Sequence, residues 1–417
     1  MRYLLLLIIM YPAFLMAQTV SLEDCLSKAL AKWPGSRSAA NAIEAGQIKQ
    51  RSAGNIWYPQ VSLGGQASWQ SDVTEVSLPI PGLSIPEIPK DQYKLYLDVN
   101  QVLYDGGISS SRSKMEMVSA YSDSVQSVVD SRKIKETVID LYCNIIYFRK
   151  VKDISSAQLA RLNKRLSAMQ SSNTNGVLSG TDYLLFSAEV KKAEQSLSEA
   201  EMTEQSMLQS LSILTGMDLD TSTALTLPKP EKSVSAELNR PEFSLFTLQN
   251  EYLSISQQAS GKTLRPKLSA FAQGGYGRPA LNMFSTEFDN YFMAGLRLNW
   301  NLYDWGQSKR EKEVLEIRKR NIGIAEENLK QNIEIQMSQQ AKEIEKIESQ
   351  LKRDDEIISI YKTVLQNSTT SLEQGVISPV DYLEKETLLK VSETEKARNE
   401  VRYIKALTTY KFIKGEI

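Results

Sequence analysis

Four short segments of the chain alternate apolar and polar residues with a period of two. They cover residues 57–70, 92–104, 266–277 and 291–303. In the fourth segment, Phe292, Leu296 and Leu298 fall on one side. Arg297 and Asn299 fall on the other. Such alternation predicts β-strands that have one apolar and one polar face.

Two longer stretches, residues 107–173 and 306–374, contain no proline and are predicted to be helices. Along the second, apolar residues recur every seven positions, with a single step of eight. The members of this seam are Leu315, Ile322, Leu329, Met337, Ile344, Leu351, Ile358, Leu365 and Leu372. A heptad seam predicts a coiled coil, and at about 1.5 Å per residue the first helix would be roughly 100 Å long. Shorter helices, packed antiparallel to the long ones, are predicted over residues 21–53, 181–214, 236–263 and 379–413.

Two motifs occur twice in the chain. Tyr104-Asp105-Gly106-Gly107 returns as Tyr303-Asp304-Trp305-Gly306, and Gly176-Val177-x-Ser179-x-x-Asp182-Tyr183 returns as Gly375-Val376-x-Ser378-x-x-Asp381-Tyr382, both after 199 residues (303 − 104 and 375 − 176). This period is far longer than that of a solenoid repeat and indicates a duplicated half. The chain is therefore divided into a first repeat, residues 18–217, a linker, residues 218–235, and a second repeat, residues 236–417.

Residues 1–17 have the features of a secretory signal peptide. Arg2 precedes a short apolar run, and Ala17 provides a small residue at the expected cleavage site. The run is shorter than the roughly 20 residues that a membrane-spanning helix needs. We therefore expect the protein to leave the cytoplasm.

Composition removes several classes of function. The 49 Lys and Arg residues are balanced by 50 Asp and Glu residues, so no basic surface for nucleic acid is expected. The absence of histidine excludes histidine acid–base catalysis and histidine metal ligands. Cys25 and Cys143 lie in separate predicted helices, and a disulfide between them is not expected. No cofactor or metal site is predicted, and an enzyme is the weakest hypothesis.

The predicted strands are long enough to cross a bilayer, which requires roughly 9–11 residues at a tilt. Aromatic residues cluster at their ends, as in an interfacial belt: Trp57, Trp69, Tyr93, Trp300, Tyr303 and Trp305. Four strands cannot close a barrel, and an open sheet edge is not tolerated in lipid. Several copies would therefore share one barrel, whether as a dimer, trimer or tetramer. The alternative is a soluble sandwich, which the long helical remainder disfavours.

The sequence resembles the TolC-like outer membrane efflux proteins over nearly the whole chain after residue 17. The resemblance rests on the opening Ser21-Leu22-Glu23-Asp24-Cys25-Leu26, on Trp57-Tyr58-Pro59, and on the order of the two repeated motifs. It implies an α+β membrane protein that forms a homotrimer in the outer membrane, with a twelve-stranded β-barrel and an α-helical periplasmic tunnel. It further implies a periplasmic adaptor and an inner-membrane transporter as partners, for drug efflux or type I secretion.

The resemblance also implies two sites. The ends of the helical hairpins would contact the adaptor, through Gly176, Val177, Leu178, Ser179, Gly375, Val376, Ile377 and Ser378. Asp381 and Glu384 would form two acidic rings at the periplasmic gate. The first repeat has Asp182 but Leu185 at the position of Glu384. Helix reversal and capping at the hairpin ends, and favourable interaction of the two carboxylates with a helix dipole, are the simpler alternatives.

A different class of function stays open as well. Long antiparallel helical hairpins also occur in periplasmic adaptors and in structural coiled-coil proteins of the cell envelope. An adaptor is expected to have one hairpin between β domains, whereas this chain has two hairpins, each after a strand pair. A channel is therefore the favoured hypothesis.

Overall fold

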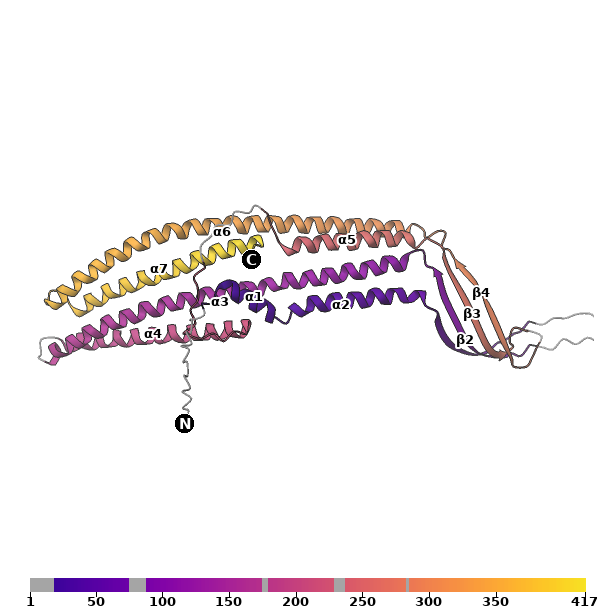
Figure 1. Cartoon of the computed structure of the whole chain (residues 1–417), viewed down its shortest axis with the longest axis horizontal. Helices are drawn as coiled ribbons and strands as arrows, with labels where there is room; N and C mark the ends of the chain where they lie inside the picture. The colour runs from indigo at the N-terminus through magenta and orange to yellow at the C-terminus, as the bar shows by residue number, and fades with distance from the viewer. Residues whose placement is uncertain (1–18, 75–87, 175–178, 229–236, 283–284) are drawn as a thin grey trace, which may run out of the picture. The chain divides into compact units, whose positions relative to one another are not determined.

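The computed structural model describes residues 19–74, 88–174, 179–228, 237–282 and 285–417 (Figure 1). Its helices are α1 (Leu22–Lys32), α2 (Ser36–Ala53), a 3₁₀ turn η1 (Gly54–Trp57), α3 (Ile108–Thr174), α4 (Gly180–Thr215), α5 (Pro241–Lys262), α6 (Gln307–Glu373) and α7 (Pro379–Lys414). Its strands are β1 (Gln60–Trp69), β2 (Asp91–Tyr104), β3 (Lys267–Arg278) and β4 (Asp289–Asn299). The described chain is therefore an α+β protein that is mostly helical.

The chain forms two compact units, and each takes residues from both sequence repeats. The helical unit consists of Met1–Ser36, Ser127–Pro241 and Leu329–Ile417. The sheet unit consists of Arg37–Gln126 and Glu242–Asn328. The long helices α3 and α6 each contribute to both units. None of the described helices is long and apolar enough to cross a membrane.

In the sheet unit, the four strands form one antiparallel sheet in the order β1-β2-β3-β4. Its register aligns the apolar faces of all four strands. Leu63 pairs with Leu97, Leu97 with Gly274, and Gly274 with Phe292. The neighbouring row on the opposite face contains Ser62, Asp98 and Gln273. The alternation in the sequence thus becomes one continuous apolar face and one largely polar face.

Nothing in the described part of the chain covers the apolar face of the sheet. Leu63 is 73% exposed and Phe292 is 70% exposed. Other exposed apolar side chains of this face are Val61, Trp69, Leu95, Leu97, Leu296 and Leu298. Large contiguous apolar surfaces of this kind mark a contact with lipid or with another protein. β4 ends at Asn299, so the predicted continuation to residue 303 is not strand.

The repeated Tyr-Asp-x-Gly motif starts both long helices. The Asp105 carboxylate accepts hydrogen bonds from the backbone N–H groups of Gly107 and Ser109, at 2.7 and 2.6 Å. Asp304 binds the backbone N–H groups of Gly306 and Ser308 in the same way, at 3.0 and 2.8 Å. These N–H groups lack partners within the helix, so the carboxylates satisfy them. The duplicated motif is therefore a helix start.

The third residue of this motif differs between the repeats for a steric reason. Gly106 and Trp305 both have positive φ, 76° and 55°. A Cβ atom on Gly106 would lie 2.9 Å from Cβ of Arg265, so glycine is needed there. Trp305 is exposed and has space for its side chain, at the usual cost of a positive φ in a bulky residue.

The heptad seam of α6 is buried as predicted. Leu315, Ile344 and Ile358 are buried, and so is Leu365. The other seam residues are at least partly shielded. Ile333 and Ile347, on the adjacent side of the helix, are more deeply buried than any seam residue. The seam therefore identified the packed side of the helix. It marked only one of the two core positions that each heptad of a coiled coil has, and Ile333 and Ile347 occupy the other.

The prediction of one helix over residues 21–53 was wrong. α1 ends at Lys32 and α2 begins at Ser36. Pro34 has no N–H group to donate and forces the preceding residue out of the helical region. Trp33 accordingly has φ −58° and ψ 123°. The break coincides in the sequence with the boundary between the two units.

In the helical unit, α1, α4, α7 and the C-terminal halves of α3 and α6 pack around apolar clusters. One cluster joins α1, α3 and α4 through Cys25, Tyr142 and Leu211. The other joins α3, α4, α6 and α7 through Leu162, Phe186, Leu365 and Tyr382. Cys25 and Cys143 are both free and buried in the first cluster. Burial raises the pKa of the Cys25 thiol to about 12 and that of Cys143 to about 11, so neither is a reactive thiolate at neutral pH.

Candidate functional site

The hairpin end between α6 and α7 is closed by two complementary caps. Gly375 has φ 71°, and the backbone N–H of Val376 donates to the carbonyl oxygen of Ser371 at 2.9 Å. This is the Schellman arrangement that ends a helix with glycine. The Ser378 side chain then begins α7 by accepting a hydrogen bond from the backbone N–H of Asp381 at 3.1 Å. The repeated motif thus has a clear structural role in reversing the chain.

The matching end between α3 and α4 is described only in part. Gly176, Val177 and Leu178 lie outside the described residues. Ser179 is the N-cap of α4, and its hydroxyl accepts a hydrogen bond from the backbone N–H of Thr181 at 3.3 Å. Ser179 and Ser378 therefore both cap helices, as the simpler alternative predicted. Whether either hairpin end also contacts a partner remains a prediction.

Asp381 and Glu384 both lie exposed in the first turns of α7 but have different surroundings. The Asp381 carboxylate completes a capping box by accepting hydrogen bonds from the backbone N–H and the hydroxyl of Ser378, at 3.1 and 2.7 Å. These hydrogen bonds lower the pKa of Asp381, so it stays ionised at neutral pH. Glu384 forms an ion pair with Lys385 at 2.9 Å. Within one chain, therefore, the two carboxylates do not form a cluster.

A buried ion pair lies further along α7 and was not predicted from the sequence. Glu386 is fully buried, and its Oε1 atom accepts a hydrogen bond from Nε of Arg161 on α3 at 2.7 Å. Its Oε2 atom is buried without a hydrogen-bond partner in the described part of the chain. Burial raises the pKa of Glu386 in spite of the Arg161 guanidinium. This pair fixes α7 of the second repeat against α3 of the first.

A second buried carboxylate connects α3 with α4. Glu204 is fully buried and forms ion pairs with Arg149 and Lys152 of α3, both at 2.7 Å. Two cations thus surround one carboxylate that has no access to water. Because the partners lie more than fifty residues apart in the sequence, their pairing becomes visible only once α3 and α4 are placed side by side.

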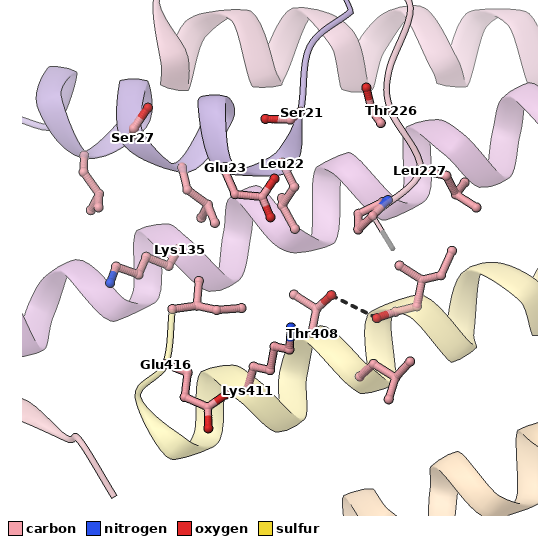
Figure 2. Close-up of a pocket in the computed structure, with 16 residues that line it drawn as sticks. Ser21, Leu22, Glu23, Ser27, Lys135, Thr226, Leu227, Thr408, Lys411 and Glu416 are labelled. Atoms are coloured by element: carbon pink, nitrogen blue, oxygen red, sulfur yellow. Dashed lines mark hydrogen bonds between the residues drawn. The ribbon is translucent and has the colours of Figure 1, made fainter. Parts of the chain in front are cut away.

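A cavity of about 740 Å³ lies in the helical unit between α1 and α7. Figure 2 shows the two helices facing each other across it, with Lys135 of α3 and the segment of Thr226 and Leu227 at its borders. Seven of its sixteen lining residues are leucine or isoleucine, and its charged residues are two acids, Glu23 and Glu416, and two bases, Lys135 and Lys411. The charges that line this cavity balance. Within the described residues, no group of histidine, cysteine, aspartate or glutamate side chains could hold a metal ion.

Comparison with known proteins relates the first repeat to a protein family. Residues 25–217 match the model of the outer membrane efflux protein family. The chain carries a domain of this family. The resemblance inferred from the two repeated motifs is thereby confirmed. The match covers the first repeat from Cys25 through the end of α4, and the family is one of efflux proteins rather than of enzymes.

The fold of the whole described chain is that of known outer membrane channels. VceC, an outer membrane protein from Vibrio cholerae, is similar with a TM-score of 0.68 and 15% identity over 94% of this chain and 96% of VceC. The CmeC outer membrane channel of Campylobacter jejuni has a TM-score of 0.69 and 13% identity over 94% and 85%. The MtrE outer membrane channel of Neisseria gonorrhoeae, in its open state, has a TM-score of 0.68 and 15% identity over 94% and 88%. No curated protein sequence matches the chain.

Proposed function

We propose that three copies of this protein form an outer membrane channel, in which the sheets together make a twelve-stranded barrel and the helices make a periplasmic tunnel. The channel is the exit duct of an efflux or type I secretion system. The observation that carries this proposal is the sheet of the sheet unit, whose apolar face is exposed and whose outer strands, β1 and β4, have no further strand beside them within the described chain.

The need for several copies follows from the backbone. Each unpaired backbone N–H or carbonyl group in hydrocarbon costs several kcal/mol, roughly 4–8 by transfer to an alkane. Pairing β1 of one copy with β4 of the next satisfies both edges and closes a ring. Small barrels have at least about eight strands, and three copies of the four-stranded sheet exceed this number. The resemblance to TolC-like efflux proteins implies three copies rather than two or four.

The hairpin ends are proposed to dock a periplasmic adaptor, which in turn contacts an inner-membrane transporter. Apolar side chains near these ends are exposed, among them Leu184 and Leu185 on α4. On the other hairpin, Val376 is 71% exposed and Val380 is exposed as well. Exposed apolar residues close to exposed backbone turns suit a surface that is covered by a partner helix.

For the periplasmic gate, we propose that Asp381 and Glu384 form acidic rings when three copies meet. The double variant Asp381→Ala, Glu384→Ala is expected to increase the conductance of the channel and to weaken block by multivalent cations, since close carboxylates hold cations in a pore. Single-channel recording in planar bilayers measures both quantities.

Ser378→Ala is the matched control for this experiment. It removes the hydroxyl of the capping box and retains both carboxylates. If Ser378→Ala changes the conductance as much as the double variant does, helix capping rather than charge explains the effect, and the gate assignment fails.

Carbonate extraction of the cell envelope tests the channel against the alternative functions. An integral barrel stays with the membrane after extraction, and we expect this result. A periplasmic adaptor without a membrane anchor, or a structural coiled-coil protein, is released. Release of the protein would reject its location in the outer membrane, and with it the proposed duct.

A further inference from the structure

A second cavity, of about 410 Å³, lies in the sheet unit where the polar face of the sheet meets the helices. We call it the junction pocket. Its walls come from the end of α2 and η1, the first turn of α3, and the adjoining ends of β2, β3 and β4: Ser52, Ala53, Ile56, Asn100, Val102, Asp105, Ile108, Ser109, Arg112, Lys267, Leu268, Ser269, Arg297 and Asn299. Four separate segments of the chain thus build it.

Three cationic side chains line this pocket, Arg112, Lys267 and Arg297. None of them forms an ion pair with a carboxylate in the described part of the chain. The Arg297 guanidinium lies 5.0 Å from the centre of the Phe271 ring, which positions it without neutralising it. Three cations without an acidic partner among the described residues thus border one cavity.

Asp105 is the only acid among the described residues that line the junction pocket. Both of its oxygens are already occupied by the backbone N–H groups of Gly107 and Ser109, which it caps at the start of α3. Its charge is therefore engaged with the positive end of that helix. Three positive charges face one negative charge, and the pocket is electropositive overall.

Asn100 adds a polar group without a partner. Its Oδ1 atom is buried and has no hydrogen-bond partner among the described residues. Buried polar atoms are almost always hydrogen-bonded, so this atom has room for a partner that the described residues do not supply, a water molecule or a bound group. Because the two ends of an amide group can exchange places by rotation, the same position can present an N–H donor to an anion.

Part of the remaining wall is apolar, through Ala53, Ile56, Val102, Ile108 and Leu268, and the rest is polar, through Ser52, Ser109, Ser269 and Asn299. A fully hydrated inorganic anion gains nothing from such a surface, whereas an apolar body attached to an anionic group does. The cations favour an anionic group, and the apolar side chains favour an apolar body attached to it. The pocket also lies on the face of the sheet opposite to the exposed apolar face, and this position disfavours a membrane lipid as its occupant.

We propose that the junction pocket binds organic anions in which a phosphate, sulfonate or carboxylate group is joined to an apolar body. The proposed binding does not depend on the protein being a channel. Its role rests on the proposed function: in a channel made of three copies, the pockets would line the lumen at the base of the barrel, and amphipathic anions would belong to the exported cargo. Basic side chains lining a pore favour anions in general.

Binding of 1-naphthyl phosphate to the detergent-solubilised protein, measured by isothermal titration calorimetry, tests the proposal. We expect Arg112→Gln, Lys267→Gln and Arg297→Gln each to weaken binding about tenfold where the side chain contacts the anion, as is usual for charge-assisted hydrogen bonds. The combined triple variant should abolish measurable binding. Inorganic phosphate and 1-naphthol, each of which carries only half of the ligand's chemistry, should bind much more weakly to the wild type.

The matched control removes three exposed lysines of the helical unit, Lys28→Gln, Lys164→Gln and Lys352→Gln, and should leave binding unchanged. Equal loss in this control would mean non-specific attraction to positive charge and would overturn the site. Binding of 1-naphthol or of inorganic phosphate as tightly as the complete ligand would also overturn it. The measurement needs no pore, so a failed channel hypothesis and a failed binding site give distinguishable results.

Discussion

Leu63→Arg is expected to prevent stable insertion of the protein into the outer membrane. Leu63 lies in the middle of β1 on the apolar face and is 73% exposed in the single chain. An arginine on the lipid face of a barrel costs about 2–4 kcal/mol near the bilayer centre, and an assembly of three copies carries that cost three times. Membrane fractionation, followed by sizing of the detergent extract, measures the loss of assembled protein.

Ser62→Arg is the control for this change. It places the same side chain one residue away, on the opposite face of the same strand, where Ser62 pairs with Asp98. This face would line water in the proposed barrel, so Ser62→Arg should insert and assemble almost normally. If both variants insert equally well, or if both fail, the sheet does not present one face to lipid and the barrel hypothesis is wrong.

Glu204→Ala is expected to reduce the free energy of unfolding by about 3 kcal/mol, because removing one partner of a buried ion pair leaves the other charge uncompensated. The lower end of the usual range applies, since the Arg149 and Lys152 side chains are 21% and 28% exposed and can turn partly towards water. Chemical denaturation of the solubilised protein, followed by far-ultraviolet circular dichroism, measures the change.

Two further variants separate charge from packing at this position. Glu201→Ala changes an exposed glutamate on the same helix and should have little effect. Replacing the whole group, with Glu204→Leu, Arg149→Met and Lys152→Met together, should recover most of the stability, because no buried charge is then left alone. A stability of Glu204→Ala equal to that of the wild type would show that the ion pairs contribute nothing to holding α3 and α4 together.

The helices and strands could be predicted from the sequence because their periodicity is local. Alternation located the strands and told which side of each is apolar, and the register of the sheet then joined these sides into one face. The heptad seam located the packed side of α6. Pro34 could have predicted the break between α1 and α2, since the effect of proline on the preceding residue is also local.

The candidate site could be predicted from the sequence only in part. The capping box at Ser378 and Asp381 is visible in the sequence as a serine followed three residues later by an acid, and the same spacing at Ser21 and Asp24 also forms a capping box. That spacing alone could have shown that Asp381 has a structural role. The pairing of Glu386 with Arg161 joins residues 225 positions apart, so only the packing of the helices reveals it.

The conductance of particles whose copy number is known decides whether this protein is a channel made of three copies. The solubilised protein is first sized by light scattering and then reconstituted into a planar bilayer. We expect a particle of three copies that conducts ions in discrete steps. A monomeric particle without conductance would contradict it, since four strands with two open edges cannot form a pore by themselves.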